Sequence, residues 1–268
     1  MKKIFLILLL LTLSGFASRI EIVSTTSHLS LLAKEIGGKS VNVTTMIPPG
    51  ICPGHYELKP NDIKRLHNGG ILLHHGWEGF VEDVSKTVSK SDAKLFKIDV
   101  HGNWLVPETQ IKAAEKICAI LKELDLENSN FYEKNLDSYI KRMHLLDKRV
   151  KQYISENKLA GIKIVCAGMQ KNFIDHLGLE VIDTFGRDED TGPVTISSLI
   201  SKIISNDVKI IVSNLQSGTS IGKMLSKNTG VPHAILSNFP GGLKNTKTIE
   251  DTVMKNLSLL KDAINNQK

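Results

Sequence analysis

The residues best suited to chemistry lie in one loop, residues 48–62, which reads PPGICPGHYELKPND. Proline fixes the backbone φ angle, so a loop with four prolines is stiff and holds its one imidazole, that of His55, in a set place. Neutral imidazole is the commonest metal ligand among side chains. The loop therefore indicates a metal ligand at His55, although a proline-rich turn with an exposed histidine would share this composition.

Further polar residues follow the ends of predicted strands, and open α/β sheets bind their ligands outside these carboxyl ends. The first half of the chain places imidazole, carboxylate and amide groups there, at His28, His55, His75, Glu78, His101 and Asn103. The second half places mainly carboxylates and amides there, at Gln170, Asp188, Glu189, Asn214, Gln216 and Asn238. This distribution predicts a site between two lobes, with imidazoles from one lobe and oxygen ligands from the other.

Each of these residues has a plainer interpretation. His28 could cap the helix that follows it, while His75 and His101 could line a cleft as hydrogen-bond donors. Glu78 could pair with a nearby cation, and Glu189 lies in an acidic run that could be a solvated turn. Uncharged amides are weak metal ligands, so hydrogen bonding to the substrate or to the ligands fits at least as well for Gln170, Asn214 and Gln216.

The elements that must position these residues alternate between strands and helices. Short runs rich in β-branched and apolar residues predict strands over 19–26, 41–47, 71–74, 95–100, 163–167, 180–185, 208–212 and 233–236. Helical patterns separate most of these runs. The alternation predicts an α/β fold with a mostly parallel, helix-covered sheet in each half of the chain, which is a pair of Rossmann-like lobes.

A long helical pattern joins the two halves. Over residues 107–158 the apolar side chains recur at helical spacing, and Asn128-Ser129-Asn130 could break or kink the helix. We expect this segment to act as a rigid spine with a metal cleft between the lobes. The predicted domains are an N-terminal lobe over 19–106, the spine over 107–158 and a C-terminal lobe over 159–268.

Residues 1–18 predict an export signal. Lys2 and Lys3 form a basic start, an apolar run follows over 4–13, and Gly15 and Ala17 provide a small-residue cleavage site. An uncleaved N-terminal anchor is the alternative. Phe16 stands where a lipoprotein would carry its lipidated cysteine, which excludes lipid anchoring through that residue. We expect an extracytoplasmic monomer.

Composition and motifs narrow the function classes. The chain is 41% hydrophobic and 23% charged, values typical of a globular protein. Its net charge of +6 comes mostly from scattered lysines, without a dense basic run, so nucleic-acid binding is not expected. The Walker A and HExxH motifs are absent from the sequence. We therefore predict no enzymatic activity, with a metallohydrolase as an alternative because histidines and carboxylates also build hydrolytic zinc sites.

The proline-rich loop resembles that of the metal-binding subunits of zinc and manganese ABC importers. In that family a run of histidine, tyrosine, glutamate and proline supplies the first histidine ligand, matched here by His55, Tyr56, Glu57 and Pro60. Gly54 stands where the family usually has proline. The segments EIGG, HHGWEGF and NWLVPET are also similar to family motifs, and the resemblance covers nearly the whole mature chain. It implies two α/β lobes joined by a long helix, with one metal ion between them.

The chain departs from the family pattern at the other ligand positions. The family has a histidine two residues before a tryptophan, whereas His101 lies three residues before Trp104 and Gly102 takes the aligned place. The nearest substitute for the third histidine is Gln170, and the late acidic region offers amides instead, at Asn214 and Gln216.

Together these observations predict a solute-binding protein that captures zinc or manganese for an ABC permease in the membrane. A carrier of a small organic or chelated-metal ligand is a further alternative. The predicted metal ligands are His55, His28, Gln170, Glu189 and His101. The residues predicted to line the cleft or support the ligands are His75, Glu78, Asn103, Asn214 and Gln216.

Overall fold

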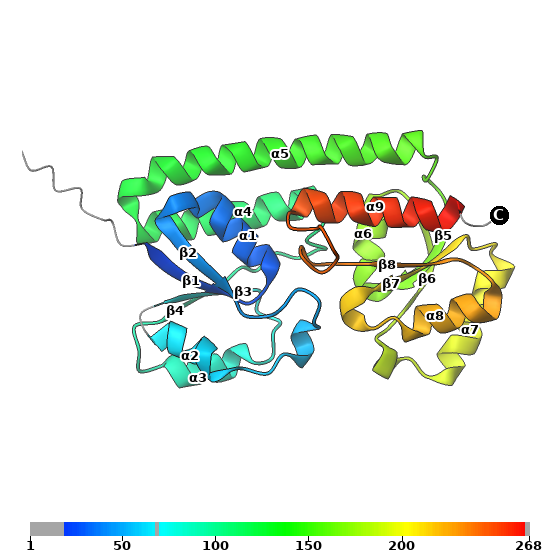
Figure 1. Cartoon of the computed structure of the whole chain (residues 1–268), viewed down its shortest axis with the longest axis horizontal. Helices are drawn as coiled ribbons and strands as arrows, with labels where there is room; N and C mark the ends of the chain where they lie inside the picture. The colour runs from blue at the N-terminus through cyan, green and yellow to red at the C-terminus, as the bar shows by residue number, and fades with distance from the viewer. Residues whose placement is uncertain (1–18, 68–69, 266–268) are drawn as a thin grey trace, which may run out of the picture.

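The computed structural model describes residues 19–67 and 70–265 (Figure 1). The predicted export signal lies outside these residues. Within the described part of the chain, no helix is both long and apolar enough to span a membrane.

The N-terminal lobe contains a four-stranded parallel sheet in the order β2-β1-β3-β4. Its strands are β1 (Ile20–Ser24), β2 (Val41–Thr45), β3 (Ile71–His74) and β4 (Lys94–Lys97). Its helices are α1 (Ser27–Gly37), α2 (Pro60–His67) and α3 (Val81–Val88). Short 3₁₀ turns follow α1 at Gly38–Ser40 and occupy the proline-rich loop at Pro53–His55.

The C-terminal lobe repeats this arrangement in the order β6-β5-β7-β8, again with parallel pairing throughout. Its strands are β5 (Lys163–Ala167), β6 (Glu180–Phe185), β7 (Ile210–Asn214) and β8 (His233–Leu236). Its helices are α6 (Lys171–His176), α7 (Pro193–Ser205), α8 (Ser220–Thr229) and α9 (Ile249–Asn265). The predicted fold class, two parallel α/β lobes joined by a long helix, is confirmed.

Strand order determines where each lobe binds ligands. In both sheets the chain moves from the second strand back across the first, so the order reverses between β1 and β3 and between β5 and β7. Ligands of open α/β sheets bind outside the carboxyl ends of the strands at such a reversal. The loops after β1, β3, β5 and β7 are therefore the places to look for a site.

The segment between the lobes consists of two helices packed against each other, α4 (Pro107–Leu124) and α5 (Ser129–Glu156). The chain turns at Asp125, whose carboxylate accepts hydrogen bonds from Asn128 Nδ2 at 2.8 Å and from the Tyr132 hydroxyl at 2.6 Å. Because the chain reverses there, α5 alone, with 28 residues, runs along both lobes (Figure 1). The 107–158 pattern thus divides into two helices, close to Asn128-Ser129-Asn130, instead of forming one continuous helix.

One hydrophobic core extends through both lobes. It includes Ile22 of β1, Ile117 of α4, Met143 of α5, Ile164 of β5 and Leu257 of α9, each at most 2% exposed. Two smaller clusters cover the opposite faces of the sheets. The spine helices and α9 therefore bind the lobes into one packed unit, which limits how far the lobes can separate.

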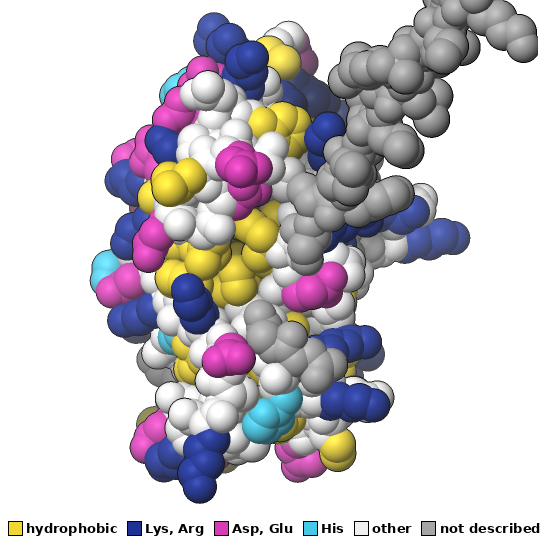
Figure 2. All heavy atoms as spheres, turned by 90° about the vertical axis from the view of Figure 1, so that its left-hand side faces the viewer, with side chains coloured by type: hydrophobic (Ala, Val, Ile, Leu, Met, Phe, Trp, Pro, Cys, Tyr) yellow, Lys and Arg dark blue, Asp and Glu magenta, His cyan; other side chains and the backbone are white. Residues whose placement is uncertain are grey.

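Figure 2 shows the outer end of the N-terminal lobe. Lysine, arginine and acidic side chains are interspersed around a group of hydrophobic side chains on this face. The described residues form no continuous basic surface there, in keeping with the scattered lysines of the sequence.

Candidate metal site between the lobes

His55 is held at the cleft by the packing of its own loop. Its backbone N–H donates to the Cys52 carbonyl at 3.0 Å, closing the 3₁₀ turn. The next residue, Tyr56, is buried and donates its hydroxyl to Asp62 Oδ2 at 2.8 Å, which fastens the loop to α2. The imidazole itself remains 59% exposed and points to the other lobe, where its Nε2 lies 3.3 Å from Glu189 Oε1. Two of the predicted ligands thus meet across the lobes.

The loop that carries Glu189 is anchored by its neighbour Asp188. The Asp188 carboxylate accepts hydrogen bonds from the backbone N–H groups of Ser220 at 3.0 Å and Ile221 at 3.1 Å, and so caps the start of α8. Burial acts to raise the pKa of Asp188, but hydrogen bonds from the Ser220 side chain and from these backbone N–H groups outweigh it and hold the pKa below its usual value. The Asp188 carboxylate is therefore occupied by the start of α8. The half-exposed side chain of Glu189 can instead face His55.

His28 lies close by but uses both ring nitrogens within the protein. Its Nε2 is 2.6 Å from the Asn238 carbonyl, which can only accept, so Nε2 carries the proton. Its Nδ1 then accepts from Gln110 Nε2 at 3.0 Å, and Gln110 Oε1 accepts from the Tyr139 hydroxyl at 2.8 Å. Burial lowers the pKa of His28 to about 3. The structure thus places His28 in a hydrogen-bonded link from the spine to the C-terminal lobe.

His75 and Glu78 belong to the interior of the N-terminal lobe. His75 Nε2 lies 2.9 Å from the Thr26 hydroxyl, and its ring stacks on Trp77 with centroids 5.0 Å apart. Burial lowers the pKa of His75 to about 3, with a smaller contribution from His74. Glu78 accepts hydrogen bonds from the backbone N–H groups of His75 and Gly76. It therefore braces the turn after β3.

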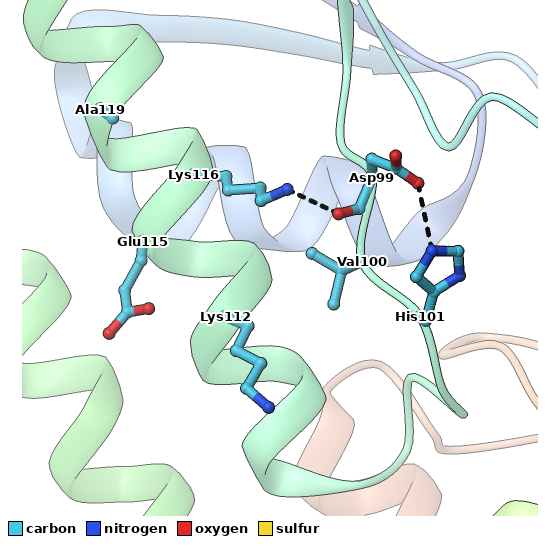
Figure 3. Close-up of a pocket in the computed structure, with 7 residues that line it drawn as sticks. All are labelled: Asp99, Val100, His101, Lys112, Glu115, Lys116 and Ala119. Atoms are coloured by element: carbon cyan, nitrogen blue, oxygen red, sulfur yellow. Dashed lines mark hydrogen bonds and ion pairs between the residues drawn. The ribbon is translucent and has the colours of Figure 1, made fainter.

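His101 lies apart from the His55–Glu189 pair. Its side chain is 98% exposed, and its Nε2 is 3.9 Å from Asp99 Oδ1. Figure 3 shows it at the rim of a surface hollow formed with α4, where Lys116 Nζ donates to the Asp99 carbonyl. Its contacts are thus with its own loop and not with the cleft ligands.

Amide side chains fasten the lobes together. Asn103 Nδ2 donates to the Met169 carbonyl and to Asn238 Oδ1, both at 3.0 Å. Gln216 Nε2 donates to the Pro49 carbonyl of the proline-rich loop at 2.7 Å. These amide groups lie between the lobes, and their hydrogen bonds join one lobe to the other.

Gln170 and Asn214 pair within the C-terminal lobe. Gln170 Nε2 donates to Asn214 Oδ1 at 3.1 Å, and both side chains are buried. Asn214 is the last residue of β7, because that strand ends two residues later than predicted. Among the described residues, Gln170 Oε1 has no hydrogen-bond partner.

Two contributors were missed by the sequence analysis. Gln110 holds the tautomer of His28, but its position in the middle of a helical pattern gave no sign of this. Arg187 lies beside the His55 loop, since a Cβ placed on Gly54 would be 3.3 Å from one of its terminal nitrogens. The sequence signal for Arg187 was its position at the end of β6, directly before the acidic run.

The protein supplies few charged donors at this place. The described residues contain no group of three or more histidine, cysteine, aspartate or glutamate side chains arranged to hold a metal ion. His55 and Glu189 form a two-donor site at the cleft. A metal bound there would keep open coordination positions, since zinc sites usually have four ligands.

Two parallel α/β lobes and a spanning helix, with side chains that face each other across the lobes, are the architecture of two-lobed solute-binding proteins. The chain belongs to the family described as ZnuA, zinc-uptake complex component A, periplasmic, whose model matches residues 22–263. The resemblance predicted from the sequence is therefore confirmed. Members of this class are substrate-binding subunits of ABC importers, which work with a membrane permease and an ATPase.

Individual relatives agree with this assignment. The chain is 26% identical to the metal ABC transporter substrate-binding lipoprotein ScbA of Streptococcus cristatus, over 87% of this chain and 88% of the relative. It is 27% identical to the manganese ABC transporter substrate-binding lipoprotein scaA of Streptococcus gordonii, with the same coverage. A crystal structure of ZnuA superimposes with a TM-score of 0.77 at 18% identity, over 92% of this chain and 100% of that one. The likeness to the ZnuA crystal structure supports the fold.

Proposed function

We propose that the protein is an extracytoplasmic carrier that captures a divalent transition metal, zinc or manganese, and delivers it to an ABC permease. The observation that carries this proposal is the 3.3 Å approach of His55 Nε2 to Glu189 Oε1 from opposite lobes. Imidazole and carboxylate are ligands for both metals, so geometry and metal availability would decide between them. The named cargo of relatives, manganese for the streptococcal scaA protein, supports the same class of ligand.

The proposal includes the way the chain is organised and exported. Residues 1–18 act as its export signal or N-terminal anchor, and a monomer with lobes over 19–106 and 159–268 forms the working unit around the 107–158 spine. The protein holds its cargo without turning it over. Hydrolase assays of the metal-loaded protein check this point, because turnover would favour the metallohydrolase alternative.

Metal binding by matched variants tests the proposal. We expect purified, chelator-stripped wild-type protein to bind zinc or manganese in a one-to-one ratio by elemental analysis and calorimetry. Loss of an outer hydrogen-bond partner typically weakens metal affinity roughly 10–100-fold, so losing a direct ligand in His55→Ala or Glu189→Gln should weaken it at least that much.

His144→Ala is the control, because His144 is exposed on α5 and far along the chain from the loop. It should bind like the wild type. Equal and negligible metal in wild type and His55→Ala, under every loading condition, would contradict the carrier assignment.

A further inference from the structure

The guanidinium of Arg187 lies beside the candidate metal site and makes no ion pair with a described residue. Arg187 directly follows the end of β6 and precedes the Asp188–Asp190 turn that presents Glu189. Its side chain makes no hydrogen bond or ion pair with any other described residue. A guanidinium stays protonated in proteins and pairs readily with planar carboxylates through parallel hydrogen bonds. An unpaired guanidinium at a ligand cleft is therefore suited to bind an anion.

Gly54 is what allows Arg187 to come this close. A Cβ at position 54 would lie 3.3 Å and 3.6 Å from the two terminal nitrogens of Arg187 and 3.7 Å from Cys52 Sγ. The family usually has proline at this position, and a proline ring there would occupy the space that the guanidinium now borders. Gly54, which departs from the family motif next to His55, thus leaves room for the Arg187 guanidinium.

Arg187 also lines a hollow of about 260 Å³ at the carboxyl ends of β5, β6 and β7. The rest of its wall is formed by Ala167, Gly168, Met169, Phe185, Gly186, Asp190 and Ser217. The hollow thus lies outside the carboxyl ends of the strands, where ligands of such sheets bind. At about 30 Å³ for each water molecule, the hollow equals some eight or nine waters, which is room for a small organic acid. Asp190 would repel part of such an anion and favour its orientation toward Arg187.

The metal site needs additional donors of this kind. His55 and Glu189 supply two ligands, whereas zinc usually takes four and manganese prefers several oxygen ligands. A nearby arginine repels a bare cation, but it attracts an anion that coordinates the metal through one carboxylate and meets the guanidinium with another. A carboxylate would therefore suit the hollow, the Arg187 guanidinium and the open coordination positions together.

We propose that the cargo is held together with a small di- or tricarboxylate, which fills the open metal positions and pairs with Arg187. The inference rests on the proposed metal-carrier function and specifies the ligand class at the same site. The carboxylate acts as a co-ligand, so the metal and the acid stabilise each other's binding. No bond other than metal coordination is made or broken.

Calorimetric titration of stripped protein with zinc, with and without malonate, tests the inference. A carboxylate that only chelates zinc in solution lowers the apparent affinity of the protein. A co-ligand raises it, so the sign of the change separates the two cases. We expect malonate to raise the zinc affinity of the wild type at least tenfold, with one ¹³C-malonate retained per zinc after gel filtration.

Arg187→Gln should lose this enhancement while binding zinc alone at least as well as the wild type, since a repelling charge has gone. Lys227→Gln is the matched control. Lys227 is also an exposed cation of the C-terminal lobe, but it lies seven residues into α8, about 10 Å from the helix start that Asp188 caps. It should retain the full enhancement.

The outcomes separate the two proposals. If the wild type binds zinc equally tightly or more weakly with malonate, or if Arg187→Gln keeps the enhancement, the co-ligand inference is wrong and the carrier function stands. If the wild type binds neither zinc nor manganese with or without malonate, the carrier function itself is wrong.

Discussion

Acidification from pH 7 to pH 5 should destabilise this protein through two buried histidines. His28 and His75 are 2% and 5% exposed, and burial lowers the pKa of each from 6.5 to about 3. In the unfolded chain both take up protons near pH 6.5, while in the folded protein they stay neutral. Their stabilising contribution is therefore complete above pH 6.5 and is lost progressively as the pH falls toward 3.

The size of the effect follows from these pKa values. Each pH unit within the window costs about 1.4 kcal/mol per histidine. Lowering the pH to 5 spans about 1.5 units of the window, or about 2 kcal/mol for each histidine and about 4 kcal/mol for both. Carboxylates contribute little over this range, because their pKa values in the unfolded chain, near 4, lie below it.

Urea unfolding of metal-free protein at pH 7 and pH 5 measures this difference. His28→Gln and His75→Gln should each lose about 2 kcal/mol of the pH dependence, since each removes one of the two histidines whose pKa is lowered to about 3. His144→Gln, a change on the exposed face of α5, should keep all of it. A wild-type loss below 1 kcal/mol, or an equal loss in the wild type and both buried variants, would refute the reasoning.

Three further substitutions probe the frame around the site. Asp188→Ala removes the cap of α8 and should cost about 1 kcal/mol of stability in urea unfolding, with weaker metal binding because Glu189 loses its anchor. Met143→Ala empties a fully buried position of α5 and should lower the free energy of unfolding by about 2–5 kcal/mol. Asn103→Ala removes two hydrogen bonds between the lobes and should speed amide exchange after β5 while leaving the Tm within a few degrees of the wild type.

The fold was largely predictable because its signals are local. Apolar strands such as residues 163–167 and 233–236 alternate with helical patterns, and that alternation determines parallel sheets in two lobes. The turn at Asp125 was harder to place, because the apolar spacing continues on both sides of it. The reversal depends on hydrogen bonds from Asn128 and Tyr132 to one carboxylate, which periodicity does not register.

The site was predictable only in part, because proximity across lobes depends on tertiary structure. His55 and Glu189 meet as the strand-end rule suggested. His28 satisfied the same rule, yet its role depends on Gln110 and Asn238, 82 and 210 residues away in the chain. His101 follows the end of β4 and still faces Asp99 of its own loop. Position after a strand thus identifies the edge of the sheet but not the direction of the side chain.

The departures from the family motif affect how the carrier should respond to its cargo. Amides at Asn103 and Gln216 join the lobes through direct hydrogen bonds, and one hydrophobic core runs through both lobes and the spine. These contacts join the two lobes without a metal ion that bridges them. We therefore expect the change on loading to be confined to the two loops that carry His55 and Glu189. Selectivity in such a carrier must come from local coordination, which is where Arg187 and an anionic co-ligand would act.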